Sequence, residues 1–386
     1  MQRSFAKRIA STVAAAALCA AFGCATKFSP ATGTGGSTAP GAGPAAVGGT
    51  GTGGTAPSSA TSVGPSGTAG AAPTASGTMM GGAGGTGAPA GASGMGGMGG
   101  TTTVASDAGV PVDGGSQVAA PQQCPATVLP PGDTMGSVQV GGQARNYILH
   151  VPASYTGKTP VPLVTDWHPI LFNDSFEQGN SGYQAKSDKE GFIVVFPDGI
   201  DNAWNVADCC TTSRTVDDVG FARALIDKLK QQACIDPKRI YAVGYSMGGG
   251  MSYKLACDAT DIIAAIAPAA FQLMTEAEWP CHPSRPITVI SFNGTADFVI
   301  PYTGGDVNPP NGLAVTNHFL GAVGTFTKWA QLDGCTDMPA DKGGGCQTYS
   351  QCKDGVEVTL CTKQGGGHET GDPNVAWDTL KRFTLP

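Results

Sequence analysis

The stretch Arg239-Ile-Tyr-Ala-Val-Gly-Tyr-Ser-Met-Gly-Gly-Gly250 decides how this chain folds. Its first five residues form a short apolar run typical of a buried strand, and a helix is expected over about 247–257. Between the two lies Gly244-x-Ser246-x-Gly248, which is the pattern of a serine on a sharp turn from strand to helix. Glycine is required on both sides because such a strained turn leaves no room for a neighbouring Cβ. Ser246 is therefore the candidate nucleophile.

Around this stretch, short apolar runs alternate with helical patterns, as in a parallel sheet covered by helices. The sequence predicts one α/β domain with a mostly parallel, doubly wound sheet. Helices are expected over about 217–233, 247–257 and 315–332. Strands are expected at 147–151, 162–167, 192–196, 239–243, 262–266, 287–292 and 356–360.

A serine hydroxyl needs a base to take its proton and a carboxylate to orient that base. On this fold they follow in the order Ser, Asp, His. The acid is expected to be Asp297, with Asp306 as the alternative, and the base is expected to be His368 in a glycine-rich loop. His318 also follows Asp297, but it falls inside the helix expected from residue 315. The other two histidines considered as a base precede Asp297 and are disfavoured by chain order: His150 and His282.

The oxyanion formed during acyl transfer needs two main-chain N–H donors. Met247, directly after the nucleophile, is expected to supply one. The loop after the strand at 162–167 should supply the other, and Ile170 is the candidate because Pro169 has no N–H. His168 in the same loop is interpreted as a residue that fixes the loop.

Two aromatic residues are candidates for contact with the substrate. Tyr245 stands beside the nucleophile, and Trp204 could stack on an aromatic acyl group or a sugar. The alternative for Trp204 is a packed loop anchor.

Composition separates the globular part from the rest of the chain. Residues 31–120 contain 28 Gly and two charged residues, so residues 25–121 are interpreted as a disordered linker rich in Gly, Ala, Thr, Ser and Pro. Residues 1–24 have a basic start and an Ala-rich apolar core, as in a bacterial signal peptide, and Gly23-Cys24 is a possible lipobox. Residues 122–386 form the expected catalytic domain. We expect an exported protein that is either extracellular or lipid-anchored through Cys24 at the cell surface.

Charge and cysteine content restrict the partners and cofactors. The net charge is −7 and there is no basic run, which argues against nucleic acid as a partner. The chain has 12 Cys without zinc-type spacing, so disulfides are expected rather than a metal site, although their pairing stays open. Cys209 and Cys210 form either a vicinal bridge or two separate bridges. A monomer is expected.

Several motifs occur together in one enzyme group. They are RNYILHVP at 145–152, PDG at 197–199, VDDVGF at 216–221, GYSMGG at 244–249 and GGGH at 365–368. The chain resembles the feruloyl esterase and polyhydroxybutyrate depolymerase family of α/β hydrolases, akin to carbohydrate esterase family 1. This resemblance covers about 136–383. It implies an α/β-hydrolase fold, a secreted serine esterase without metal or organic cofactor, and a triad of Ser246, Asp297 and His368.

The leading hypothesis is a serine carboxylesterase that cleaves feruloyl or related acyl esters of plant cell-wall polysaccharide. A depolymerase of poly(3-hydroxybutyrate)-type polyesters and an esterase for acetyl-xylan or generic esters are alternatives within the same chemistry. The alternative outside catalysis is an inactive, esterase-like surface binding protein. It is motivated by Pro169, since the family often has glycine at that position.

Overall fold

A computed structural model of the chain describes residues 124–207, 211, 215–308 and 315–386. The predicted leader, with Cys24, and the whole predicted linker lie outside these residues, and so do Cys209 and Cys210. The domain boundaries given above therefore stay predictions. Within the described residues no helix is long and apolar enough to cross a membrane.

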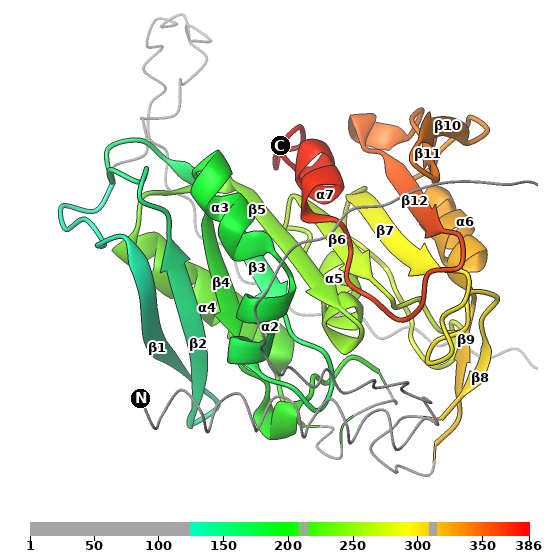
Figure 1. Ribbon diagram of the computed structural model, residues 1–386, viewed down its shortest axis with the longest axis horizontal. Coiled ribbons are helices and arrows are strands. Elements are labelled where there is room, and N and C mark those ends of the chain that lie inside the picture. Colours follow the sequence, from blue (N-terminus) through cyan, green and yellow to red (C-terminus); the bar gives the residue numbers. More distant parts are fainter. Residues whose placement is uncertain (1–123, 208–210, 212–214, 309–314) are drawn as a thin grey trace, which may run out of the picture. The chain divides into compact units, whose positions relative to one another are not determined.

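The described residues form a ten-stranded sheet with strand order β1-β2-β4-β3-β5-β6-β7-β12-β11-β10 (Figure 1). Its centre, from β4 to β12, is parallel, while the pairs at both edges are antiparallel. This arrangement confirms the α/β-hydrolase expectation. The strands are Gly132–Val140 (β1), Gln143–Val151 (β2), Val161–Trp167 (β3), Ile193–Pro197 (β4), Ile235–Tyr245 (β5), Ala265–Ala269 (β6), Thr288–Gly294 (β7), Ala340–Gly343 (β10), Cys346–Tyr349 (β11) and Val358–Lys363 (β12). A separate two-stranded sheet pairs Gly305–Val307 (β8) with Asn317–Phe319 (β9).

Helices cover both faces of the large sheet, and each face has its own hydrophobic core (Figure 1). Leu225, Met251 and Trp329 fill the core on one side, and Tyr183 and Trp377 belong to the core on the other. Burial on both faces explains why the central strands read as continuous apolar runs. The helices are Asp174–Asn180 (α2), Tyr183–Glu190 (α3), Asp218–Gln232 (α4), Met247–Asp258 (α5), Ala322–Leu332 (α6) and Pro373–Leu380 (α7), with 3₁₀ turns at Ile200–Asn202 and Lys353–Gly355.

Two of the predicted elements are placed differently by the structure. The helix expected over 315–332 begins only at Ala322, and residues 317–319 are instead strand β9. Gly321 explains the break, because its φ is 80° and a Cβ there would lie 2.7 Å from the Thr303 carbonyl oxygen. The strand expected at 262–266 runs over 265–269, since residues 262 and 263 donate main-chain hydrogen bonds to Ala259 in a turn.

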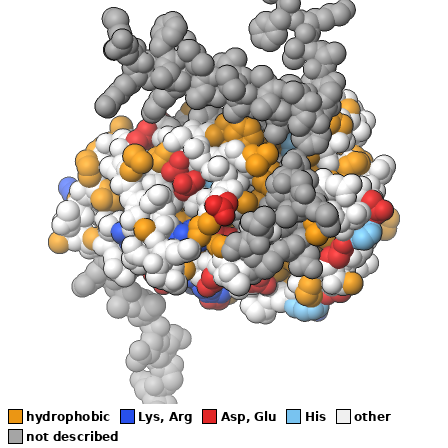
Figure 2. Space-filling model, turned by 90° about the horizontal axis from the view of Figure 1, so that it is seen from below, with side chains coloured by type: hydrophobic (Ala, Val, Ile, Leu, Met, Phe, Trp, Pro, Cys, Tyr) orange, Lys and Arg blue, Asp and Glu red, His pale blue; other side chains and the backbone are white. Residues whose placement is uncertain are grey.

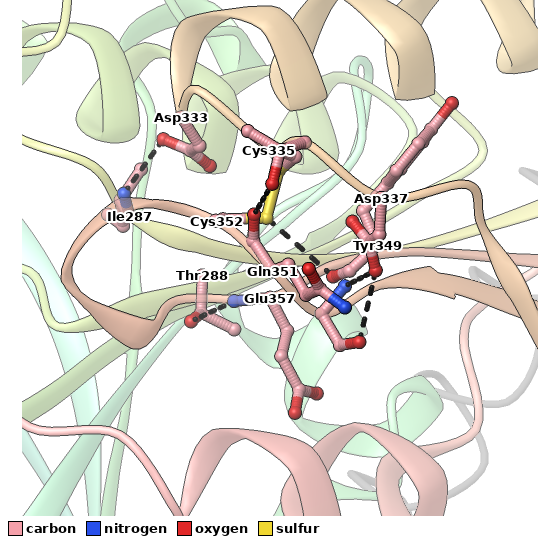
Figure 3. The surroundings of a disulfide bond; sticks show 11 residues. Ile287, Thr288, Asp333, Cys335, Asp337, Tyr349, Gln351, Cys352 and Glu357 are labelled. Atoms are coloured by element: carbon pink, nitrogen blue, oxygen red, sulfur yellow. Dashed lines mark hydrogen bonds between the residues drawn. A yellow bond between two sulfur atoms is a disulfide. The ribbon is translucent and has the colours of Figure 1, made fainter.

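Disulfides stabilise the described part of the chain, as predicted. Cys335–Cys352 joins the end of α6 to the segment between β11 and β12 (Figure 3). Beside it, the buried carboxylate of Asp333 accepts a hydrogen bond from Ile287 N–H at the start of β7 (Figure 3). The other bridges between described residues are Cys346–Cys361, Cys257–Cys281 and Cys124–Cys234.

Candidate active site

Ser246 lies on the turn between β5 and α5, at the end where the parallel strands finish. Its φ is 54° and its ψ is −122°, a strained conformation for a residue other than glycine. The neighbouring glycines are required by close packing: a Cβ on Gly248 would lie 1.7 Å from the Trp167 carbonyl oxygen. A Cβ on Gly244 would lie 2.4 Å from the Gly248 carbonyl oxygen. The turn is held by a hydrogen bond from Ser246 N–H to the Ala269 carbonyl.

The structure brings together the three residues that the sequence suggested for the triad. The Ser246 Oγ to His368 Nε2 distance is 2.8 Å, and the His368 Nδ1 to Asp297 Oδ2 distance is also 2.8 Å. The imidazole can therefore donate from Nδ1 to the carboxylate and accept from the serine hydroxyl at Nε2. Ser246 and Asp297 are only 7% and 8% exposed, so these hydrogen bonds are largely protected from water.

Asp297 is oriented by its own loop. Its Oδ1 accepts hydrogen bonds from the main-chain N–H groups of Val299 (2.8 Å) and Ile300 (3.0 Å). The other oxygen stays available for His368. Asp306, the alternative acid, lies on β8 with its carboxylate 3.5 Å from His318 Nε2. The structure therefore pairs His368 with Asp297 and not with Asp306.

The loop that carries His368 is fastened to the loop that carries Asp297. Ala296 N–H donates to the Gly366 carbonyl, and Gly365 N–H donates to Thr295 Oγ1. A Cβ on Gly294 would lie 2.2 Å from the Gly366 carbonyl oxygen, so this close approach requires glycine. The acid and the base thus sit on two loops that form one hydrogen-bonded unit.

Tyr245 contributes to the same unit from β5. Its hydroxyl donates a 2.9 Å hydrogen bond to the His368 carbonyl oxygen, and its ring centroid lies 5.2 Å from that of the imidazole. Burial raises the pKa of the Tyr245 hydroxyl. Tyr245 was expected to contact substrate, which stays a prediction, and the structure adds a contact that holds the base.

The two predicted oxyanion donors follow the ends of two adjacent strands, β3 and β5. Trp167 at the end of β3 is paired with Gly244 of β5, so the loop with Ile170 follows β3 beside the nucleophile turn. Within the described part of the chain, no hydrogen bond from the N–H of Ile170 or of Met247 to a main-chain carbonyl is found. Met247 is the first residue of α5, where N–H groups have no partner inside the helix. The role of both N–H groups as oxyanion donors stays a prediction.

His168 is fully buried and fixes this loop, as the sequence suggested. Gly199 N–H donates to its Nε2 at 2.9 Å, so the ring hydrogen is on Nδ1, which donates to the Pro169 carbonyl at 2.8 Å. Burial lowers the pKa of His168 to about 4. A neutral imidazole with both nitrogens occupied leaves His168 no role as the base.

Trp204 does not lie where a substrate-stacking residue would. Its side chain is 0% exposed, with the indole ring 4.9 Å from that of Trp167 in an edge-to-face contact. This burial contradicts the suggested stacking on substrate and agrees with the alternative of a packed loop anchor.

The remaining histidines are engaged by other acids. His318 is on β9, not in a helix as expected, and its Nδ1 lies 2.6 Å from Glu278 Oε1. His150 is buried between two carboxylates, and His282 is exposed with its Nε2 3.3 Å from Glu276.

A pair of buried carboxyl groups, not expected from the sequence, brackets the loop that carries Ile170. Asp166 lies on β3 before the loop and Glu177 on α2 after it, and they are 0% and 1% exposed. Among the described residues none of the four carboxyl oxygens of this pair has a hydrogen bond of normal geometry, although the Ser181 side chain lies beside Asp166, and the pair lines a cavity of about 10 Å³. Burial raises the pKa of Asp166 to about 7 and that of Glu177 well above its ordinary value. The only sign of this pair in the sequence was a charged residue, Asp166, directly before Trp167 in the expected strand.

Comparison with known proteins identifies the family. The chain is 42% identical over 250 residues to feruloyl esterase B of Piromyces equi, which covers 63% of this chain and 46% of that protein. It is 30% identical over 276 residues to NocK of Nocardia uniformis subsp. tsuyamanensis, which is named as an esterase, and this match covers 66% of this chain and 79% of that protein. The chain belongs to the feruloyl esterase and polyhydroxybutyrate depolymerase family of α/β hydrolases.

Membership in this family agrees with the site geometry described above. The chain spans about half the length of feruloyl esterase B, and no family model matches it. Among solved structures, an acetyl xylan esterase from Aspergillus awamori matches with a TM-score of 0.45 and 15% sequence identity. The match covers 64% of this chain and 99% of that chain.

Proposed function

We propose that this feruloyl-esterase-family chain hydrolyses carboxylic esters through an acyl-enzyme on Ser246. The observation that carries the proposal is the unbroken series of hydrogen bonds from Ser246 through His368 to Asp297 on a strained, glycine-flanked turn. A buried serine, a base and an acid in this order are the groups that acyl transfer needs.

The reaction follows from the positions of these groups. As Ser246 Oγ attacks the ester carbonyl carbon, His368 Nε2 takes the hydroxyl proton and the carbonyl oxygen becomes an oxyanion. The N–H groups of Met247 and Ile170 stabilise this oxygen. The imidazolium, stabilised by Asp297, then gives its proton to the departing alcohol. A water molecule repeats the sequence on the acyl-enzyme and releases the acid.

For the substrate we propose feruloyl or related acyl esters of plant cell-wall polysaccharide. The 42% identity to feruloyl esterase B supports this class. The edge of the sheet where the site lies also exposes apolar surface: Leu171, after β3, is 45% exposed and Phe298, beside Asp297, is 57% exposed. Figure 2 views the molecule from below Figure 1, where the parallel strands end, and shows hydrophobic side chains on this face. Exposed apolar side chains beside a hydrolytic site suit a hydrophobic acyl group.

We also propose that the protein is exported, with a lipid anchor at Cys24 as the specific form. Four disulfides between described residues fit an oxidising compartment. Metabolic labelling with a radioactive fatty acid should mark the expressed protein, and Cys24→Ala should abolish the label. A labelled Cys24→Ala protein would exclude that anchor.

The activity is tested with three substrates in parallel: methyl ferulate, p-nitrophenyl acetate and a suspension of poly(3-hydroxybutyrate). The matched control is Ser246→Ala, which removes one oxygen and should keep the fold. We expect the parent protein to hydrolyse methyl ferulate and p-nitrophenyl acetate, and the variant to hydrolyse neither. Circular dichroism should give the same spectrum for both proteins.

Each outcome has one interpretation. Turnover retained by Ser246→Ala would place the nucleophile elsewhere. Clearing of the polyester without ferulate release would replace the polysaccharide substrate by a polyester. No turnover of any substrate, together with no labelling of Ser246 by a fluorophosphonate, would favour the binding-protein alternative.

A further inference from the structure

The two predicted oxyanion donors come from separate segments, so their spacing has to be fixed by something outside either segment. Met247 begins α5, whereas Ile170 belongs to the loop that follows β3. That loop contains Pro169, which cannot donate a hydrogen bond, and Leu171, which has a φ of 68°. Positive φ is unfavourable for a leucine, and such a conformation persists only where the surroundings impose it.

Trp204 contacts both segments. Its indole N–H donates a 2.8 Å hydrogen bond to the His168 carbonyl oxygen, two residues before Ile170. Its main-chain N–H lies 3.2 Å from the sulfur of Met247. The side chain is fully buried, so both contacts are shielded from water.

Two further hydrogen bonds join the loop to the segment that contains Trp204. Leu171 N–H donates to the Asn202 carbonyl, and Gly199 N–H donates to His168 Nε2. Residues 199–204, which follow β4, therefore hold the segment from His168 to Leu171 at three points. Of these three hydrogen bonds, only the one from Trp204 uses a side chain of residues 199–204. A substitution can therefore remove it without changing the main chain.

We propose that Trp204 is a positioning residue for the oxyanion hole: its indole N–H fixes the carbonyl of His168, and thereby the direction of the Ile170 N–H relative to the N–H of Met247. This inference rests on the proposed esterase function. Trp204 does not touch the substrate, and its loss should therefore lower transition-state stabilisation more than substrate binding. Complete loss of an oxyanion donor lowers kcat by about 10²–10³-fold, so a misdirected donor should lower it by about 10–100-fold.

The test compares Trp204→Phe with Trp329→Phe. Trp329, on α6, is also buried, at 1% exposure, but among the described residues its indole nitrogen has no hydrogen-bond partner. The two substitutions remove the same atoms from two buried sites. Measured quantities are kcat and KM for p-nitrophenyl acetate, the inhibition constant of a trifluoromethyl ketone, whose adduct carries an oxyanion, and the thermal midpoint.

We expect Trp204→Phe to lower kcat and to weaken binding of the trifluoromethyl ketone by about the same factor, with KM nearly unchanged. Trp329→Phe should change neither, whatever its effect on the thermal midpoint. Equal kcat values and equal ketone affinities for the two variants would overturn the positioning role. Failure of the parent protein to hydrolyse any ester would instead refute the proposed function itself.

If Trp204→Phe does not fold, Trp204 can be replaced by β-(3-benzothienyl)alanine, in which sulfur takes the place of the indole N–H. This residue keeps the size and shape of the ring and removes only the donor. The same parallel loss of kcat and ketone affinity is expected. Unchanged values in this protein would overturn the proposal.

Discussion

Replacing Asp166 by asparagine should stabilise the protein in mildly alkaline solution. Asp166 faces Glu177 inside the fold, and burial raises the pKa of Asp166 to about 7 from an ordinary value of 3.8. A carboxyl group with a raised pKa in the folded state binds its proton more tightly there than in the unfolded chain. Its contribution to stability is therefore complete below about pH 4 and is lost as the pH rises through about 7.

The magnitude follows from the difference between the two pKa values. Each unit is worth about 1.4 kcal/mol, so ionisation of Asp166 lowers the free energy of unfolding by up to roughly 4 kcal/mol between pH 4 and pH 8. Asp166→Asn cannot ionise, and its amide can donate a hydrogen bond to Glu177. Below about pH 4 the variant should match the parent protein, the difference should grow between pH 4 and pH 7, and at pH 8 the variant should be more stable by up to this amount.

The assay is urea unfolding followed by tryptophan fluorescence at pH 5, 6, 7 and 8. Asp227→Asn, at an exposed position of α4, is the control for loss of one charge. The difference between Asp166→Asn and the parent should grow with pH, and the difference for Asp227→Asn should not. Parallel pH dependence for Asp166→Asn and the parent protein, or a less stable variant at pH 8, would contradict a raised pKa of Asp166 in the folded protein.

Three further predictions concern the turn, the base and a disulfide. Gly248→Ala should abolish hydrolysis and lower the thermal midpoint, because its Cβ would overlap the carbonyl that ends β3; near-normal kcat would contradict this packing. Tyr245→Phe should lower kcat by a few-fold, since the hydrogen bond to the His368 carbonyl is lost, and a KM effect alone would point to substrate contact instead. Removing the Cys124–Cys234 bridge by double substitution with serine should destabilise by about 4–5 kcal/mol, as its loop spans 110 residues, and urea unfolding measures the change.

Where the pattern was local, the sequence was enough to predict the fold. The strand before Ser246, the glycines around it and the helix after it are all determined by neighbouring residues. The edge strands were missed for a physical reason: β10 is exposed along its whole length and has no apolar alternation. Strand β9 could not be predicted either, because pairing with β8 overrides the local preference there.

The triad was predictable because its members follow a fixed chain order and each stands beside glycine or a strand end. Trp204 was ambiguous because its environment depends on His168 and Met247, which are 36 and 43 residues away in the sequence. The Asp166–Glu177 pair was not predictable for a similar reason. Both residues read as ordinary polar positions until β3 and α2 place them face to face.

The hydrogen bonds between the Asp297 loop and the His368 loop also bear on how the enzyme would lose function on heating. Ala296 N–H donates to the Gly366 carbonyl and Gly365 N–H donates to the Thr295 hydroxyl, so the amides of Ala296 and Gly365 should exchange with solvent in a single opening event. Ser246 is held separately, by its N–H bond to Ala269 within the sheet. A warmed protein would therefore lose its acid and base together, while the nucleophile stays in place on an otherwise folded sheet.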